Sequence, residues 1–348
     1  MLLIALRDLQ WRRRRFLIGV IATGLVFALA LLITGMGASF RNEVKRTVNA
    51  MGADAWVVPS GTSGPFTAAT TFPESVADEV ARRPGVEQAS PIAVLRFTVQ
   101  TPSLKDINVV AVDIDGVGSP VPNDGKPLAA SGEAVVDKTL GMDVGETLRI
   151  GGRPFRVVGK TSGLTFFAGT PTVFLPLADG QAIAMGGAKL ATSVATRGVP
   201  ASVPDGTKQM TNAEVVTDLQ RPLKQATQTI NFLCVLLWIV AAGIIGSIVY
   251  LQALERVRDF AVLKATGTTN SSLLAGLALQ AVLLSLLSAV AAVVLAALLT
   301  PLLAMPAEIS SGAYILLPII AVIVGLLASL AGLRRAVGVD PALAFGGA

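Results

Sequence analysis

The sequence predicts an α-helical membrane protein with four transmembrane helices and an extracytoplasmic mixed α/β domain inserted between helices 1 and 2. The composition is the first reason, since 52% of the 348 residues are hydrophobic and 15% are charged, against roughly 25% charged in a soluble domain. The second reason is that four uncharged stretches each reach the length of about 20 residues that a helix needs to cross a bilayer core. Between the first two stretches lies a segment of mixed composition and domain size.

The uncharged stretches divide the chain into spans and connecting segments. In chain order we predict an interfacial N-terminal helix (1–15), the first span with an outward stalk (16–40), the α/β domain (41–224), the second span (225–253), a cytoplasmic helix and turn (254–271), the third span (272–300), an outer loop (301–313), the fourth span (314–333) and a cytoplasmic tail (334–348). A secretory signal peptide is the alternative at the N-terminus. We favour a span there because the apolar run has full length and no A-x-A site closes it.

Lys and Arg residues near the spans predict the orientation, because cytoplasmic flanks carry an excess of them. They are Arg7 and Arg12–Arg15 before the first span, Arg256, Arg258 and Lys264 between the second and third, and Arg334 and Arg335 after the fourth. The loop 301–313 has neither residue type, and the domain 41–224 is neutral, with 18 basic and 18 acidic residues. Both termini are therefore expected in the cytoplasm and the domain outside. The net charge of +5 then reflects topology and does not indicate nucleic-acid binding.

The segment 41–224 alternates short apolar runs with turns rich in Gly and Pro, which predicts a fold with its own core. The expected elements are strands over Ala55–Val58, Ala93–Val99, Ile107–Asp113 and Thr172–Leu175 and a helix over Pro73–Arg82. Leu148–Ile150 and Phe155–Gly159 flank the pair Gly151 and Gly152, which predicts a β-hairpin with a tight turn.

Two loops of this domain contain residue types that can carry a function. Asp113 and Asp115 share a short loop and suggest either calcium binding or a turn; a turn is favoured because the EF-hand spacing is missing. Phe166 and Phe167 lie in a loop rich in Gly and Thr. They are expected either as exposed contacts for a client or as part of the core.

Missing residue types exclude most catalytic chemistry. The sequence has no His, the commonest general base and metal ligand, and its one Cys, Cys234, cannot form a disulfide within the chain. No charged residue lies in a predicted span, which argues against an ion-coupled route. No G-x-x-x-x-G-K-[ST] phosphate loop occurs. Energy for any work must therefore come from a partner.

Residues 251–274 form a charged island between two spans. Its apolar residues Leu254, Val257, Phe260 and Ala261 are spaced for one helix face, and Glu255, Arg256, Arg258 and Asp259 occupy other positions. This spacing predicts an amphipathic helix. Gly267 is expected to end it in a left-handed conformation, and Asn270 or Ser271 to cap the next helix.

Small residues four apart occur in two spans, a spacing that lets helices approach closely in lipid. The pairs are Ala242/Gly246 and Gly243/Ser247 in the second span and Gly325/Ser329 and Ala328/Gly332 in the fourth. Such pairs mark either a dimer face or a chance occurrence.

The segment Leu254–Leu274, LERVRDFAVLKATGTTNSSLL, resembles the corresponding segment of permease subunits in the MacB/FtsX family of ABC transporters, also called type VII. The family pattern is approximately E-R-x-x-E-[IF]-x-[VL]-[LR]-[KR]-A-[LT]-G. Here Glu255, Arg256, Phe260, Leu263, Lys264, Ala265 and Gly267 match it, and Asp259 stands for the second acid. Weaker similarities are Asp340–Ala344 and the hairpin of residues 145–160. Gln280 stands where many relatives have Glu.

The resemblance implies a permease homodimer in a bacterial cytoplasmic membrane, with two copies of a separate cytoplasmic ATPase that binds ATP and Mg. This chain is implied to be non-catalytic, with no cofactor or metal of its own. The helix 254–264 would pass motion of the ATPase to the spans and the outer domain. Phe260 and Leu263 are expected in a groove of the ATPase, with Glu255, Arg256, Asp259 and Lys264 around them and Gly267 ending the helix.

The function expected from this resemblance is export or extraction of an amphipathic substrate such as a lipid, lipoprotein, peptide or drug. The alternative is an FtsX-like regulatory complex whose outer domain binds and activates a cell-wall hydrolase. Import of a small solute is less favoured, because the uncharged spans offer no ion-coupled route.

Overall fold

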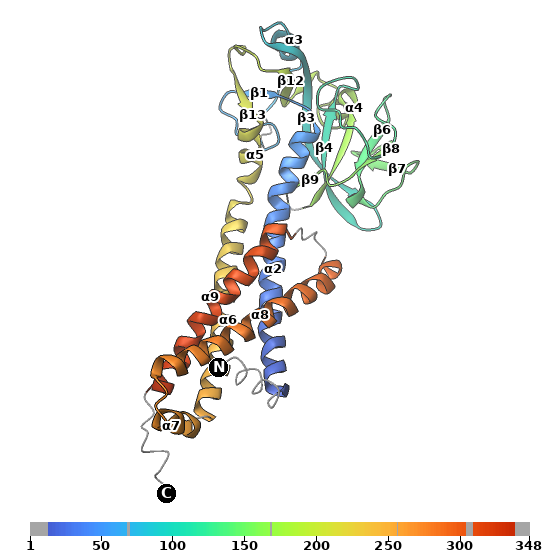
Figure 1. The fold of residues 1–348 in the computed structure, drawn as a ribbon. Coiled ribbons are helices and arrows are strands. Elements are labelled where there is room, and N and C mark those ends of the chain that lie inside the picture. Colours follow the sequence, from blue (N-terminus) through green and yellow to red (C-terminus); the bar gives the residue numbers. More distant parts are fainter. Residues whose placement is uncertain (1–12, 68–69, 168, 256, 304–308, 338–348) are drawn as a thin grey trace. The chain divides into compact units, whose positions relative to one another are not determined.

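The computed structural model describes residues 13–67, 70–167, 169–255, 257–303 and 309–337. The chain divides into two compact units. The first comprises Met1–Ser39 and Thr227–Ala348, and its described part is helical; the second, Phe40–Ala226, is built around a β-sheet (Figure 1).

Four helices within the described ranges are long and apolar enough to cross a membrane. They are α2 (Arg13–Ala50), α6 (Lys224–Glu255), α8 (Asn270–Leu299) and α9 (Ser311–Val337). A short helix, α7 (Val257–Ala265), lies between α6 and α8, and the 3₁₀ turn η2 (Thr300–Leu302) follows α8. Apolar side chains on the outer faces are exposed, for example Ile18 at 67% and Ile315 at 69%, as expected for surfaces that lie in lipid. Helix α2 continues past the predicted end of the first span at residue 40 and reaches Ala50.

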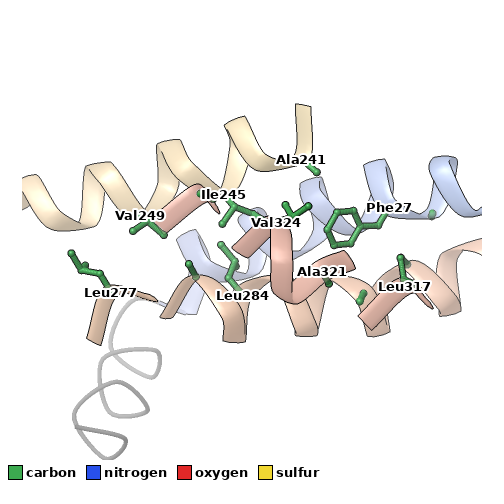
Figure 2. Packing of buried hydrophobic residues seen from close by; sticks show 14 of the residues in the cluster. Phe27, Ala241, Ile245, Val249, Leu277, Leu284, Leu317, Ala321 and Val324 are labelled. Carbon is green, nitrogen blue, oxygen red and sulfur yellow. The ribbon is translucent and has the colours of Figure 1, made fainter. Parts of the chain in front are cut away.

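The first unit has one apolar core to which all four long helices contribute. Figure 2 shows Phe27 of α2, Ile245 and Val249 of α6, Leu284 of α8 and Val324 of α9 in this cluster. All five side chains are at most 5% exposed. The core therefore forms without any charged side chain among its buried members.

Small residues set the closest approach between α8 and α9. A Cβ added at Gly325 would lie 2.6 Å from Ser285 Oγ and 3.0 Å from the Ala281 carbonyl oxygen. Ser329, one turn further on, is also buried. The Gly325/Ser329 pair thus packs within the chain, whereas a Cβ at Gly243 of α6 meets none of the described atoms within 4 Å. Gly243 therefore lies on a face of α6 that no described residue of this chain covers.

The second unit contains an eleven-stranded mixed sheet in the order β13-β1-β12-β3-β4-β10-β6-β8-β5, with β7 paired to β8 and β9 to β10. A two-stranded sheet, β11-β2, lies apart from it. The strands are β1 (Ala55–Pro59), β2 (Phe72–Pro73), β3 (Val86–Gln100), β4 (Leu104–Val112), β5 (Asp124–Gly125), β6 (Glu133–Asp137), β7 (Thr147–Ile150), β8 (Arg153–Thr161), β9 (Thr165–Phe166), β10 (Thr170–Pro176), β11 (Leu190–Ala191), β12 (Ser193–Gly198) and β13 (Thr207–Thr211). The helices are α3 (Val76–Ala81), α4 (Leu177–Ala184) and α5 (Asn212–Gln220), with a 3₁₀ turn η1 (Lys138–Leu140).

The sheet is covered on both faces. Along β4, Val110 and Val112 belong to one buried cluster, while Ile107 and Val109 belong to another. Successive side chains of a strand point to opposite faces, so the two clusters lie on opposite sides of the sheet. This explains why the predicted strand here reads as a continuous apolar run.

The predicted strands and the hairpin occur, with β3 much longer than expected. Gly151 and Gly152 turn between β7 and β8 with φ values of 56° and 81°, as a type I′ turn requires. The helix expected over Pro73–Arg82 is shorter, because Pro73 pairs with Leu190 in the small sheet and the helix begins at Val76. A two-stranded ribbon consists of edge strands, where a proline is tolerated.

The last turns of α2 belong to the second unit. Val44 and Val48 are fully buried in the same cluster as Trp56. Glu43 Oε1 accepts a hydrogen bond of 2.8 Å from the Gly169 amide, and Thr47 Oγ1 donates one of 2.8 Å to the Thr165 carbonyl oxygen. Polar and apolar contacts therefore fix this helix end to β9 and to Gly169, which lies between β9 and β10.

Candidate functional site

The structure describes the predicted coupling segment on both sides of residue 256: the end of helix α6 precedes it, and helix α7 follows it. Helix α6 ends at Glu255 and α7 begins at Val257. Arg256 lies outside the described residues, as do residues 1–12 of the predicted N-terminal helix and the weaker family match Asp340–Ala344.

Gly267 ends α7 as expected. Its φ is +92°, its amide donates to the Lys264 carbonyl oxygen at 3.0 Å, and the Thr268 amide donates to the Leu263 carbonyl oxygen at 2.9 Å. These two bonds form a Schellman motif, which needs a left-handed residue at the position of Gly267. The next helix is capped differently from the prediction: Thr269 is its N-cap residue, not Asn270 or Ser271, and makes no side-chain bond to the helix amides.

The side chains of α7 divide into a buried and an exposed set. Phe260 is 6% exposed and Ala261 is fully buried, and Phe260 packs in the core of the first unit with residues of α6 and α8. Val262 and Leu263 are 52% and 39% exposed. Asp259 and Glu255 are also exposed, and Lys264 is partly buried.

The burial of Phe260 bears on the expectation that this residue lies in a groove of the ATPase. The Phe260 ring packs against its own chain in this structure, and its contact with a groove of the ATPase stays a prediction. Leu263 keeps the exposure that a partner contact requires, and Val262 joins it. Val262 is not among the predicted contacts, although it occupies the [VL] position of the family pattern and precedes Leu263 on the helix.

Both phenylalanines of the loop rich in Gly and Thr pack with the core of the outer domain, and a client contact of Phe167 stays a prediction. Phe166 is fully buried, and its ring lies 5.6 Å from that of Phe66. Phe167 is half-buried at a φ of 57°, and its ring faces the Arg96 guanidinium at 4.0 Å. Arg96 carries no sequence signal of its own, because β3 brings it to this loop from far along the chain.

The loop of Asp113 and Asp115 is a turn. The Gly116 amide donates to the Asp113 carbonyl oxygen at 3.0 Å, and Gln88 Nε2 donates to the Asp115 carbonyl oxygen at 3.0 Å. Within the described ranges, no group of three His, Cys, Asp or Glu side chains is placed to hold a metal ion.

Comparison with known proteins accounts for both units. Residues 17–216 match the family model of the MacB-like periplasmic core domain, and residues 231–341 match the FtsX-like permease C-terminal model. Two Mycobacterium tuberculosis proteins named as ABC transporter permeases, from strain ATCC 25618 / H37Rv, are 47% and 44% identical over 348 residues, which is 100% of this chain and of each relative. The chain belongs to the MacB/FtsX-type family of ABC transporter permeases. Its predicted family and its predicted fold class are thereby confirmed.

Solved structures with a similar outer domain are more distant. The periplasmic region of MacB from Actinobacillus actinomycetemcomitans is 12% identical with a TM-score of 0.36, over 51% of this permease and 98% of that chain. The extracellular domain of the transporter YknZ from Gram-positive bacteria is 15% identical with a TM-score of 0.35, over 45% of this permease and 98% of that chain.

Family membership assigns a role to each unit of the permease. The four helices are its transmembrane part, and the mixed α/β unit is an extracellular domain inserted after the first helix. An ABC transporter permease implies a cytoplasmic ATPase as partner.

Proposed function

We propose that this permease transmits motion from a cytoplasmic ATPase to its outer domain and thereby exports or extracts an amphipathic substrate at a bacterial cytoplasmic membrane. The observation that carries the proposal is the division of α7, whose Phe260 is buried in the transmembrane core while Val262 and Leu263 are exposed. A helix anchored on one side and open on the other transfers a push on Leu263 to the helices that hold Phe260. In this proposal both termini are cytoplasmic.

Helix α2 offers a route for the motion from the transmembrane part to the outer domain. It is a single helix from Arg13 to Ala50, and Val44 and Val48 are buried in the core of the domain. A continuous helix resists bending because each turn is hydrogen-bonded to the next. Displacement of its transmembrane part would thus act on the residues that Glu43 and Thr47 bind.

The proposed complex contains two permeases and two ATPases, with ATP and Mg bound only in the ATPases. No charged residue lies in the predicted spans, so an ion gradient has no side chains through which to act. Motion driven by ATP hydrolysis in a partner therefore suits this chain. An amphipathic substrate suits a device that works from the outer face, since such a molecule partitions into the membrane and needs no polar path through it.

The first test replaces the exposed apolar pair of α7. The double variant Val262→Glu, Leu263→Glu should lose association with the ATPase at least tenfold, because two charges would have to be buried in the contact. Tagged permease is purified with its ATPase from its own host and placed in nanodiscs, and the ATPase bound per permease and the ATP turnover are measured. Val121→Glu in the outer domain, at a side chain that is 88% exposed, is the matched control.

Phe260→Ala separates the two roles on α7. It should lower the thermal stability of the permease, by about 3 kcal/mol for a large core side chain, and leave the ATPase bound to the folded fraction. Normal association and turnover in the Val262, Leu263 variant would contradict the proposal. A normal cycle of ATP hydrolysis with no substrate moved, together with a cell-wall hydrolase bound to the outer domain, would favour the regulatory alternative.

A further inference from the structure

The outer domain contains a hollow whose lining residues play no part in the proposed transmission of motion. Its volume is about 780 Å³, within the range of roughly 300–1,000 Å³ of pockets for small molecules. It lies between β3, the end of α4, Phe167, the residues Thr67 and Thr71, and the residues Pro222 and Leu223 that follow α5. Its apolar lining includes Phe66, Val94, Leu95, Phe167, Met185 and Leu223.

One side chain in this lining is charged. Arg96 follows Val94 on the same face of β3, and both line the hollow. In the part of the chain that the structure describes, no carboxylate forms an ion pair with its guanidinium. Arg96 also lines a smaller hollow of about 250 Å³ together with Asp106, whose Oδ1 accepts a hydrogen bond of 2.7 Å from Thr98 Oγ1.

The contact between Arg96 and Phe167 depends on an unusual backbone conformation. Phe167 has a φ of 57° and is the only residue other than glycine with a positive φ in the described ranges. Such a conformation is rare for a bulky residue and is maintained where the surroundings impose it. Here the Phe167 ring lies between the buried Phe166 ring, with centroids 5.1 Å apart, and the Arg96 guanidinium, 4.0 Å from its centroid. The contact between Arg96 and Phe167 thus places a positive charge beside the apolar lining of the hollow.

We propose that this hollow binds an anionic amphipath, with a carboxylate or phosphate on Arg96 and a hydrocarbon chain against Phe66, Phe167 and Leu223. The planar guanidinium binds either group through two parallel hydrogen bonds. Because its face lies over the Phe167 ring, its N–H groups can point toward the ligand. The apolar lining excludes a small inorganic anion as the preferred occupant. The proposal rests on the proposed function, because it names the substrate class of the same permease.

The binding test uses the full-length permease in phosphatidylcholine nanodiscs without the ATPase. Radiolabelled dodecanoate is titrated, with empty nanodiscs as the background, and dodecanol serves as the uncharged analogue of equal chain length. Wild type should bind dodecanoate at least tenfold more tightly than dodecanol. Arg96→Gln should lose that preference and leave dodecanol binding unchanged, since a hydrogen bond to a charged group is worth about 1.5–3 kcal/mol.

Three further variants locate the site. Arg96→Lys keeps the charge without the fork and should retain part of the preference. Met185→Trp fills the hollow and should weaken both ligands. Arg197→Gln removes an exposed arginine of β12 and should change neither. Equal binding of dodecanoate and dodecanol by wild type, or unchanged binding in Arg96→Gln, would overturn the proposal.

A second arm distinguishes a soluble amphipath from a lipid of the bilayer. Phosphatidic acid bearing a photoreactive chain is built into the nanodisc, and crosslinking to the outer domain is mapped in wild type and Arg96→Gln. Arg96-dependent crosslinking identifies a membrane lipid as the source, and dodecanoate binding alone identifies a soluble amphipath. The Val262, Leu263 variant should bind dodecanoate normally, so loss of coupling and loss of ligand binding are separate results.

Discussion

The two units of this permease bury different kinds of groups. The core of the transmembrane unit consists of apolar side chains and of small residues that let helices touch, as at Gly325. Buried polar side chains of the transmembrane unit are hydroxyl groups such as those of Ser285 and Ser288, whereas the outer domain also buries carboxylates, as at the fully buried and hydrogen-bonded Asp137. We therefore expect the transmembrane unit to depend mainly on the fit of its side chains, and the outer domain to depend on that fit together with the hydrogen bonds of its buried carboxylates.

The largest effect is expected at Asp137. Its Oδ2 accepts hydrogen bonds from the Leu164 amide at 2.8 Å and from Thr161 Oγ1 at 3.3 Å, and its Oδ1 accepts from the Thr139 amide and hydroxyl at 3.0 and 2.8 Å. Asp137→Ala leaves these buried donors unpaired and should lower the free energy of unfolding by about 3 kcal/mol or more. The loop before β9 would lose its anchor at Leu164.

Thermal unfolding of the purified permease, followed by tryptophan fluorescence, measures this loss. Asp137→Asn keeps an acceptor at Oδ1 and should recover part of the stability. If Asp137→Ala melts like wild type, the polar contacts of the outer domain are dispensable, and the difference between the two units disappears.

A somewhat smaller effect is expected at Gly325, where the transmembrane unit depends on shape alone. Gly325→Leu would force α9 away from Ser285 and the Ala281 carbonyl oxygen, which lie 2.6 and 3.0 Å from an added Cβ. Overpacking of this kind costs about 1–3 kcal/mol. Gly243→Leu is the control of equal size change, because no described atom lies within 4 Å of a Cβ there.

Thermal aggregation in detergent, read by size-exclusion chromatography, compares the two glycine variants. Gly325→Leu should aggregate at a lower temperature than wild type, and Gly243→Leu should match it. A lower aggregation temperature for Gly243→Leu as well would indicate that this face of α6 is covered in the assembled protein, as a permease dimer would require.

The sequence predicted the features that depend on local physics. Four spans follow from uncharged length, the β7–β8 hairpin from the pair Gly151 and Gly152, and the end of α7 from Gly267. Each needs only neighbouring residues to be specified, since a turn or helix end with positive φ selects glycine whatever lies around it.

Features that depend on long-range pairing were not predictable. Phe260 fits one apolar helix face whether that face meets its own chain or an ATPase, and no local signal distinguishes the two. Arg96 and Phe167 meet only because the pairing of β3 with β4 and of β4 with β10 brings distant segments together. Pro73 satisfied the pattern of a helix start, but pairing with Leu190 decided its conformation.

The smallest effect is expected at Asp113, a carboxyl group of the outer domain. The predicted spans contain no charged side chain with which to compare it. Burial raises the pKa of Asp113, and the negative charges of Glu74 and Asp78 raise it further. A carboxyl group whose pKa is higher in the folded state destabilises the fold when it is ionised, and this penalty disappears as the pH falls toward the pKa of the unfolded chain, about 3.9.

Asp113→Asn should therefore raise the melting temperature at pH 7 by about 1 to 2 °C after solvent screening, and the gain over wild type should shrink as the pH approaches 4. Asp115→Asn, which removes the same charge from an exposed side chain in the same turn, is the control. An equal gain in both variants would assign the effect to the net charge of the domain and not to the burial of Asp113.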